Sequence, residues 1–77
     1  MDRRDRIIGI IQKVSKKDDV PAVDASLFDS GLLDSFALPD LVSELEQEFS
    51  VKIPDSDLNP RKFDSVERIE GYLESRQ

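Results

Sequence analysis

The sequence contains no cysteine, histidine or tryptophan among its 77 residues, and only 6% of its residues are aromatic. Without cysteine, neither a disulfide nor a thiolate metal site can stabilise the fold. Without histidine, the chain lacks the commonest general base and the commonest metal ligand, which argues against hydrolase-type nucleophilic catalysis. We therefore expect no catalytic residue, no bound metal and no enzyme activity from the chain alone. Its stability must come from helix packing and helix caps.

Long apolar runs are also missing, so we expect no membrane span, no export signal and a cytoplasmic protein. The chain has 17 acidic and 11 basic residues, which gives a formal net charge of −6. This charge argues against nucleic-acid binding, which needs clustered Lys and Arg, and it favours partners with basic surfaces. A chain of 77 residues has room for one modest core, so we expect one domain over residues 1–77 and a monomer.

Three stretches have the apolar spacing of amphipathic helices. The first runs from about residue 3 to about residue 16, the second ends near Phe49, and the third begins after a cap at Asp64 or Ser65. Asp64 and Glu67 have the spacing of a capping box. Short helical turns are expected within 54–58 and 59–63. The sequence thus predicts an all-α fold: a small four-helix bundle, with three main helices and one short helix.

The connection over residues 18–34 is too apolar for a disordered linker. We expect it to pack against the bundle, with Phe28 and either Leu32 or Leu33 inserted into the core. A structured connection of this length is uncommon and often functional.

The second helix carries the most informative pattern. Its apolar positions are Leu38, Leu41, Val42, Leu45 and Phe49, and its acidic positions include Asp40, Glu44, Glu46 and Glu48. Asp34 or Ser35 can cap its first turn, where Pro39 is tolerated because N–H groups there have no intrahelical partner. Ser35 would then lie at a helix N-terminus, whose partial positive charge suits an attached phosphate. Taken alone, the acidic positions would be an ordinary solvated helix face, and Ser35 an ordinary cap.

The segment from Asp55 to Asn59 resembles the start of a calcium-binding loop. The sixth position of that loop is Pro60, where glycine is required, and the twelfth is Val66, where a bidentate Glu is needed. A turn with helix caps therefore explains this segment better than a metal site does.

Residues 28–58 resemble the signature region of the acyl carrier protein family. The shared features, in order, are the Asp34-Ser35 pair, an acidic helix reading Leu-Val-Ser-Glu-Leu-Glu-Gln-Glu-Phe, and an Ile-Pro-Asp turn at residues 53–55. The tail that begins at Phe63 is similar to the last helix of that family, so the resemblance covers essentially the whole chain.

The resemblance implies that Ser35 carries covalent 4′-phosphopantetheine, transferred from coenzyme A by a separate magnesium-dependent phosphopantetheinyl transferase. The thiol of that group would hold an acyl or aminoacyl cargo as a thioester, and Asp34 would contribute to recognition by the transferase. Phe36, Asp40, Glu44 and Glu48 would face acyl-transferring, ligating or synthase enzymes that have basic docking patches. Such docking supplies encounter rate and orientation, and it should weaken with salt.

Three positions depart from the usual pattern of the family: Phe36, Ala37 and Pro39. They favour a specialised, free-standing carrier that serves secondary metabolism, a modified lipid or D-alanyl transfer rather than general fatty-acid synthesis. The alternative is an unmodified helical adaptor that binds partners through Asp40, Glu44 and Glu48.

Overall fold

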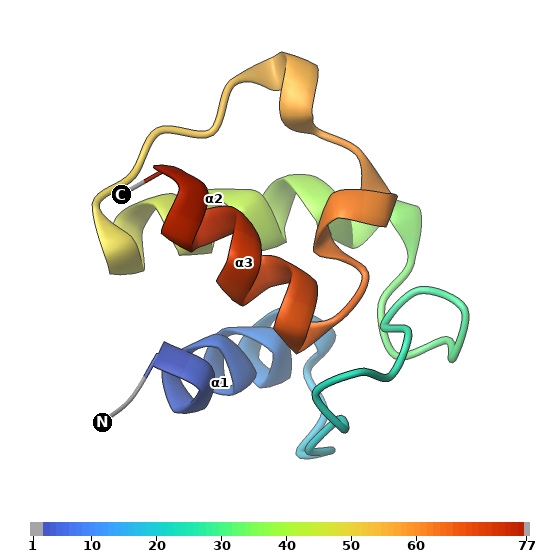
Figure 1. Cartoon of the computed structure of the whole chain (residues 1–77). Coiled ribbons are helices and arrows are strands. Elements are labelled where there is room, and N and C mark those ends of the chain that lie inside the picture. The colour runs from blue at the N-terminus through green and yellow to red at the C-terminus, as the bar shows by residue number, and fades with distance from the viewer. Residues whose placement is uncertain (1–2, 77) are drawn as a thin grey trace.

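The computed structural model describes residues 3–76 and contains three α-helices joined by loops and short 3₁₀ turns. The α-helices are α1 (Arg3–Ser15), α2 (Leu38–Phe49) and α3 (Val66–Arg76), and the 3₁₀ turns are η1 (Ser35–Ala37), η2 (Asp55–Asp57) and η3 (Pro60–Phe63). Helix α1 packs against both α2 and α3 (Figure 1). The predicted all-α bundle is confirmed, and its short fourth helix is represented by η2 and η3, with no strand within residues 3–76.

The core consists of apolar side chains from every α-helix and from the connections between them. Its buried members are Ile7, Ile10, Ile11, Leu27, Leu33, Leu38, Leu41, Val42, Leu45, Phe49, Ile53, Phe63, Val66, Ile69 and Leu73. All five apolar positions predicted for the second helix are among them. In α1, Ile7, Ile10 and Ile11 are buried, whereas Ile8 and Val14 are only partly buried. The helix phase predicted from the sequence is therefore confirmed for α2.

The connection between α1 and α2 is packed against the bundle, as predicted, but different side chains anchor it. Leu27 and Leu33 enter the core, whereas Phe28 and Leu32 are only partly buried. The expectation for Phe28 was therefore wrong. Its backbone N–H donates to Asp64 Oδ1 at 3.2 Å, which fixes Phe28 at the rim rather than in the interior.

Asp64 anchors this connection and does not form the predicted capping box. Its Oδ1 also accepts a hydrogen bond from Ser26 Oγ at 2.8 Å, and its backbone carbonyl accepts from the N–H of Leu27 at 2.6 Å. Ser65, the alternative predicted cap, serves α3: its Oγ accepts from the N–H of Arg68 at 3.1 Å. The capping box fails because the carboxylate of Asp64 is already engaged by the connection.

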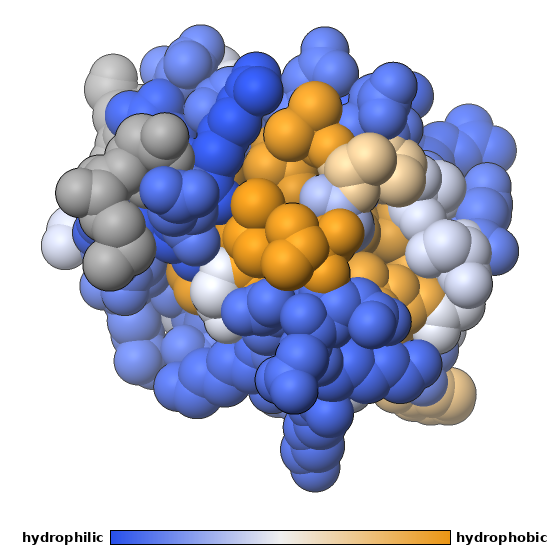
Figure 2. Space-filling model, turned by 90° about the horizontal axis from the view of Figure 1, so that it is seen from below, coloured by the Kyte–Doolittle hydropathy of each residue, from blue (hydrophilic) through white to orange (hydrophobic). Residues whose placement is uncertain are grey.

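Not all apolar surface is covered by this packing. On the face seen from below, where α1 and the connection after it lie, apolar side chains gather between charged ones (Figure 2). Within residues 3–76, no helix has both the length and the apolar character required to cross a lipid bilayer.

Candidate functional site

Ser35 lies on the surface at the point where the long connection meets the helical segment that includes α2. It is the first residue of η1, and its side chain is exposed. No residue within 3–76 makes a hydrogen bond to its hydroxyl oxygen. The next residue, Phe36, is 88% exposed, so neither neighbour in the turn shields this hydroxyl from an approaching enzyme.

The start of the second helical segment differs in one respect from the prediction. Asp34 is a cap, but it caps η1 rather than α2: its Oδ1 accepts from the N–H of Ala37 at 3.0 Å. The N–H of Leu38 then donates to the carbonyl of Ser35, a 3₁₀ bond. Pro39 has no N–H and cannot donate to that carbonyl, so the α-helical hydrogen bonds begin only beyond it. Ser35 is thus placed one 3₁₀ turn ahead of the α-helix.

The residues around Ser35 suit a covalently attached phosphodiester. Backbone N–H groups of Ser35 and Phe36 have no acceptor among residues 3–76, as is usual for the first turn of a helix. Such groups stabilise a nearby negative charge. A shallow cleft of about 320 Å³ adjoins the turn and is lined in part by Lys16, Asp34 and Asp40. The turn therefore offers an accessible nucleophilic oxygen, unpaired N–H donors and a nearby cation.

Comparison with known proteins decides the family. The family model described as "Phosphopantetheine attachment site" matches residues 5–73 of the chain. The chain is also 34% identical over 77 residues to the D-alanyl carrier protein of Streptococcus sanguinis, covering 99% of this chain and 98% of that protein. The chain belongs to the acyl carrier protein family. Two further relatives are D-alanyl carrier proteins: that of Streptococcus suis, 32% identical over 90% of this chain and 87% of the relative, and that of Lactobacillus acidophilus, 28% identical over 97% and 95%.

As a member of this family, the carrier protein is modified with covalent 4′-phosphopantetheine, which confirms the expected prosthetic group. The thiol of that group supplies the chemistry that a chain without cysteine lacks, because it can hold a cargo as a thioester. The chain's own contribution is to supply the side-chain oxygen to which that group is attached.

Three of the acidic side chains of α2 are engaged within the fold of this carrier protein. Glu44 and Glu48 are paired with cations of α1: Lys13 Nζ lies 3.2 Å from Glu44 Oε2, and Arg6 Nε lies 2.7 Å from Glu48 Oε2. Glu46 has a structural role, since its Oε2 accepts from the N–H of Ile53 at 2.8 Å.

Asp40 is exposed, as Glu48 is, but differs from these acids because it pairs with no described cation of the carrier protein. It also lines the cleft next to Ser35. Sequence reasoning grouped Asp40, Glu44 and Glu48 on one face. The structure places only Asp40 beside Ser35 with its charge uncompensated.

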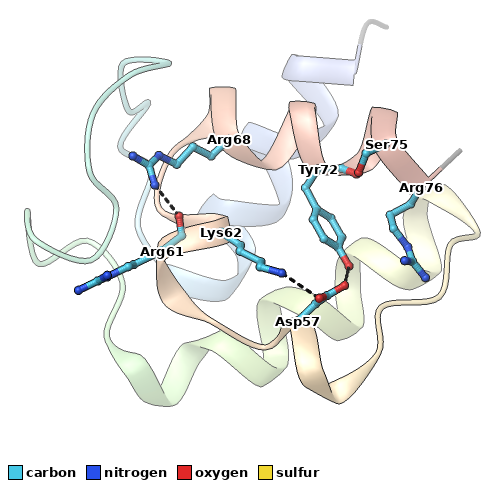
Figure 3. A pocket seen from close by; sticks show the side chains of 7 residues that line it. All are labelled: Asp57, Arg61, Lys62, Arg68, Tyr72, Ser75 and Arg76. Carbon is cyan, nitrogen blue, oxygen red and sulfur yellow. Dashed lines mark hydrogen bonds and ion pairs between the residues drawn. The ribbon is translucent and has the colours of Figure 1, made fainter.

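A second site, which the sequence reasoning missed, lies between η2, η3 and α3. It is an open pocket of about 640 Å³ (Figure 3), lined by Asp57, Arg61, Lys62, Arg68, Tyr72, Ser75 and Arg76. The signal was present in the sequence: Arg68, Tyr72 and Arg76 recur every four residues and so share one face of α3.

Two hydrogen bonds to Asp57 organise the floor of this pocket. Lys62 Nζ lies 2.8 Å from Asp57 Oδ1, and Tyr72 Oη donates to Asp57 Oδ2 at 2.6 Å. The hydrogen bond from Lys62, followed by that from Tyr72, lowers the pKa of Asp57 below its ordinary value. Burial, followed by the hydrogen bond to Asp57, raises the pKa of Tyr72 to about 12. Asp57 is therefore ionised, and Tyr72 protonated, throughout the neutral range.

Proposed function

We propose that this chain is a D-alanyl carrier protein that holds D-alanine as a thioester on a phosphopantetheine arm attached to Ser35. The observation that carries the proposal is the exposed, unengaged hydroxyl of Ser35 at the start of η1. The relatives that match nearly the whole chain support D-alanine as the cargo. This proposal narrows the several pathways that the sequence alone left open.

The surroundings of Ser35 are consistent with a small, charged cargo. The core side chains Leu41, Leu45 and Ile69 are fully buried, so they offer no exposed apolar surface to a cargo. The adjoining cleft is lined by the carboxylates of Asp34 and Asp40, by the cation Lys16 and by several apolar side chains. An aminoacyl thioester has a free ammonium group, which these carboxylates attract, whereas a long acyl chain would need an apolar cavity.

Each proposed site residue has a distinct part in the modification. Ser35 Oγ forms the bond to phosphorus, and the nucleotide portion of coenzyme A leaves. Asp34 holds the turn in shape through its bond to the N–H of Ala37, and its exposed carboxylate is available to the transferase. Phe36, exposed next to Ser35, offers an apolar contact of the kind that dominates many interfaces. Asp40 supplies a further negative charge next to these contacts in our proposal, with Glu44 and Glu48 further along α2.

The attachment site is tested by intact-mass measurement after incubation with a broad-specificity phosphopantetheinyl transferase and coenzyme A. We expect the mass to rise by one phosphopantetheine group in the natural chain and not in the Ser35→Ala variant. Ser43→Ala is the matched control, because Ser43 is an exposed serine within α2. Modification of Ser35→Ala, or its loss in Ser43→Ala, would contradict the assignment. Partner capture that is unaffected by Ser35→Ala, without any modification, would support the unmodified adaptor instead.

The cargo is tested separately on protein isolated from its host. We expect a mass that corresponds to phosphopantetheine plus one alanyl group, removable by hydroxylamine as expected for a thioester. Chiral analysis of the released amino acid should give the D-enantiomer. A fatty acyl group in place of alanine would refute the D-alanyl proposal and leave the attachment site intact.

A further inference from the structure

The pocket between η2, η3 and α3 concentrates positive charge on an acidic molecule. Four cationic residues, Arg61, Lys62, Arg68 and Arg76, line it together with a single carboxylate, that of Asp57. The chain as a whole has a formal net charge of −6. The local charge is therefore opposite in sign to that of the rest of the surface.

The cations of this pocket are used differently from those of α1. Arg3, Arg4, Arg6 and Lys13 each pair with a glutamate of α2 or α3. Within residues 3–76, no carboxylate lies within ion-pair distance of Arg61, Arg68 or Arg76. Ion pairing within the fold therefore does not account for three guanidinium groups gathered around one pocket.

Two of these guanidinium groups are held in place by backbone carbonyls. Arg68 Nη1 donates to the carbonyl of Arg61 at 2.8 Å, and Arg76 Nη2 donates to the carbonyl of Lys52 at 3.2 Å. Lys62 is held instead by the side-chain carboxylate of Asp57. Because these side chains are already ordered, less conformational entropy is lost when a ligand binds them.

The two ends of the pocket are both cationic. Figure 3 shows Lys62 and Tyr72 converging on Asp57, with Arg76 beside Tyr72; Arg61 and Arg68 lie at the other end, with their side chains extending away from Asp57. A ligand that satisfies both ends needs several negatively charged oxygens. A phosphoryl group carries close to two charges and three acceptor oxygens at neutral pH, and guanidinium groups bind it in a bidentate manner.

From this arrangement we propose that the pocket is a binding site for a small molecule that bears more than one phosphoryl group. The site is separate from Ser35 and does not depend on the proposed cargo. A volume of about 640 Å³ lies within the usual range for small-molecule sites. A large acidic protein or an anionic membrane would also meet the negative charges elsewhere on the chain, whereas a small ligand within the pocket is largely screened from them at physiological salt.

The test is a titration of the full, isotopically labelled chain with sodium pyrophosphate at constant ionic strength, followed by NMR. We expect saturable shifts at Tyr72, Lys62 and Ser75, and tighter binding of pyrophosphate than of inorganic phosphate. The variant Arg68→Gln/Arg76→Gln should weaken binding by about tenfold or more, since it removes the charge-assisted contact at either end of the pocket where pyrophosphate can bind. The matched control Lys13→Gln/Lys17→Gln removes the same charge outside the pocket and should bind as the natural chain does.

Two further measurements keep the outcome clear. The variant Arg68→Lys/Arg76→Lys retains the charge and should fold normally, yet bind more weakly because it lacks the bidentate fork. The variant Ser35→Ala should bind pyrophosphate unchanged, which separates this proposal from the proposed carrier function. Equal losses in the pocket variant and the control, or shifts that sodium chloride alone reproduces, would overturn the proposal.

The source of the phosphoryl groups is distinguished by two other probes. Co-sedimentation with phosphatidylglycerol vesicles but not phosphatidylcholine vesicles, without binding of pyrophosphate, would replace the small molecule by a lipid surface. Binding of a hexaglutamate peptide without binding of pyrophosphate would indicate an acidic protein partner and refute the phosphate assignment. Absence of binding to all three probes would also refute it.

Discussion

The side chain of Arg6 in α1 contacts both the side chain and the backbone carbonyl of Glu48 in α2. Arg6 Nε lies 2.7 Å from Glu48 Oε2, and Arg6 Nη2 donates to the carbonyl of Glu48 at 2.8 Å. The same guanidinium lies 4.6 Å from the centre of the Phe49 ring. Carbonyls in the last turn of a helix lack intrahelical partners and carry a partial negative charge. Arg6 therefore caps the C-terminal end of α2 and compensates the negative charge of Glu48.

Replacing Arg6 with glutamine should lower the free energy of unfolding by about 1 kcal/mol, because three partly exposed contacts are lost together. Urea unfolding followed by circular dichroism measures this change. Lys13→Gln is the control: it removes only the ion pair with Glu44 and should cost no more than about 0.5 kcal/mol. Equal losses in the two variants would show that the additional contacts of Arg6 add nothing.

Asp40 should matter more than Glu48 for docking, if the proposed partner surface is correct. Glu48 is already compensated by Arg6, whereas Asp40 makes no ion pair within residues 3–76. We expect Asp40→Asn to slow association with the phosphopantetheinyl transferase by about two- to fivefold at low salt, and Glu48→Gln to have a smaller effect. Stopped-flow measurements at two salt concentrations test this order. The reverse order would place the docking surface further along α2.

Two glycines should respond in opposite ways to alanine. Gly9 lies within α1, and a Cβ atom there would meet nothing within 4 Å. Gly9→Ala should therefore stabilise the chain by about 0.5–1 kcal/mol. Gly31 has a φ of +84°, a backbone conformation that residues other than glycine rarely adopt. Gly31→Ala should destabilise the chain by about 1 kcal/mol or more. Thermal unfolding of both variants measures the two signs.

Tyr72 should titrate well above the ordinary tyrosine range. The chain has one tyrosine and no tryptophan, so the absorbance change that accompanies ionisation of a phenol reports on this group alone. The folded chain should give a midpoint near pH 12, compared with the ordinary value of 10.0. Asp57→Asn should lower that midpoint, since it removes both the charge and the carboxylate acceptor. An unchanged midpoint would show that burial alone sets the pKa of Tyr72.

The same shift predicts how stability depends on pH. Folded Tyr72 keeps its proton more tightly than the unfolded chain does, so its contribution is fully present below about pH 10 and is lost as pH rises through about 12. Asp57 acts in the opposite direction because its pKa is lowered in the folded state. Its contribution is present above its ordinary value of 3.8 and is lost as pH falls through the folded pKa.

The sequence allowed the helices and the candidate acceptor serine to be predicted, because these depend on local patterns. Apolar spacing gave the phase of α2 correctly, and Pro39 with Asp34 indicated a helix start near Ser35. The capping box at Asp64 and Glu67 failed for a reason that no local pattern contains. Ser26 and Phe28, more than thirty residues away in the chain, compete for the Asp64 carboxylate.

By itself, the sequence determined an all-α bundle, a chain unable to provide its own thiol, and a serine at a helix start next to an acidic helix. Only the tertiary structure decided which charges remain free. It pairs Glu44 and Glu48 with α1, leaves Asp40 uncompensated, and gathers the basic residues of η3 and α3 around Asp57 and Tyr72. The physical reason is that an electrostatic interaction depends on distance in space and on exposure to solvent, and both are set when distant segments pack together.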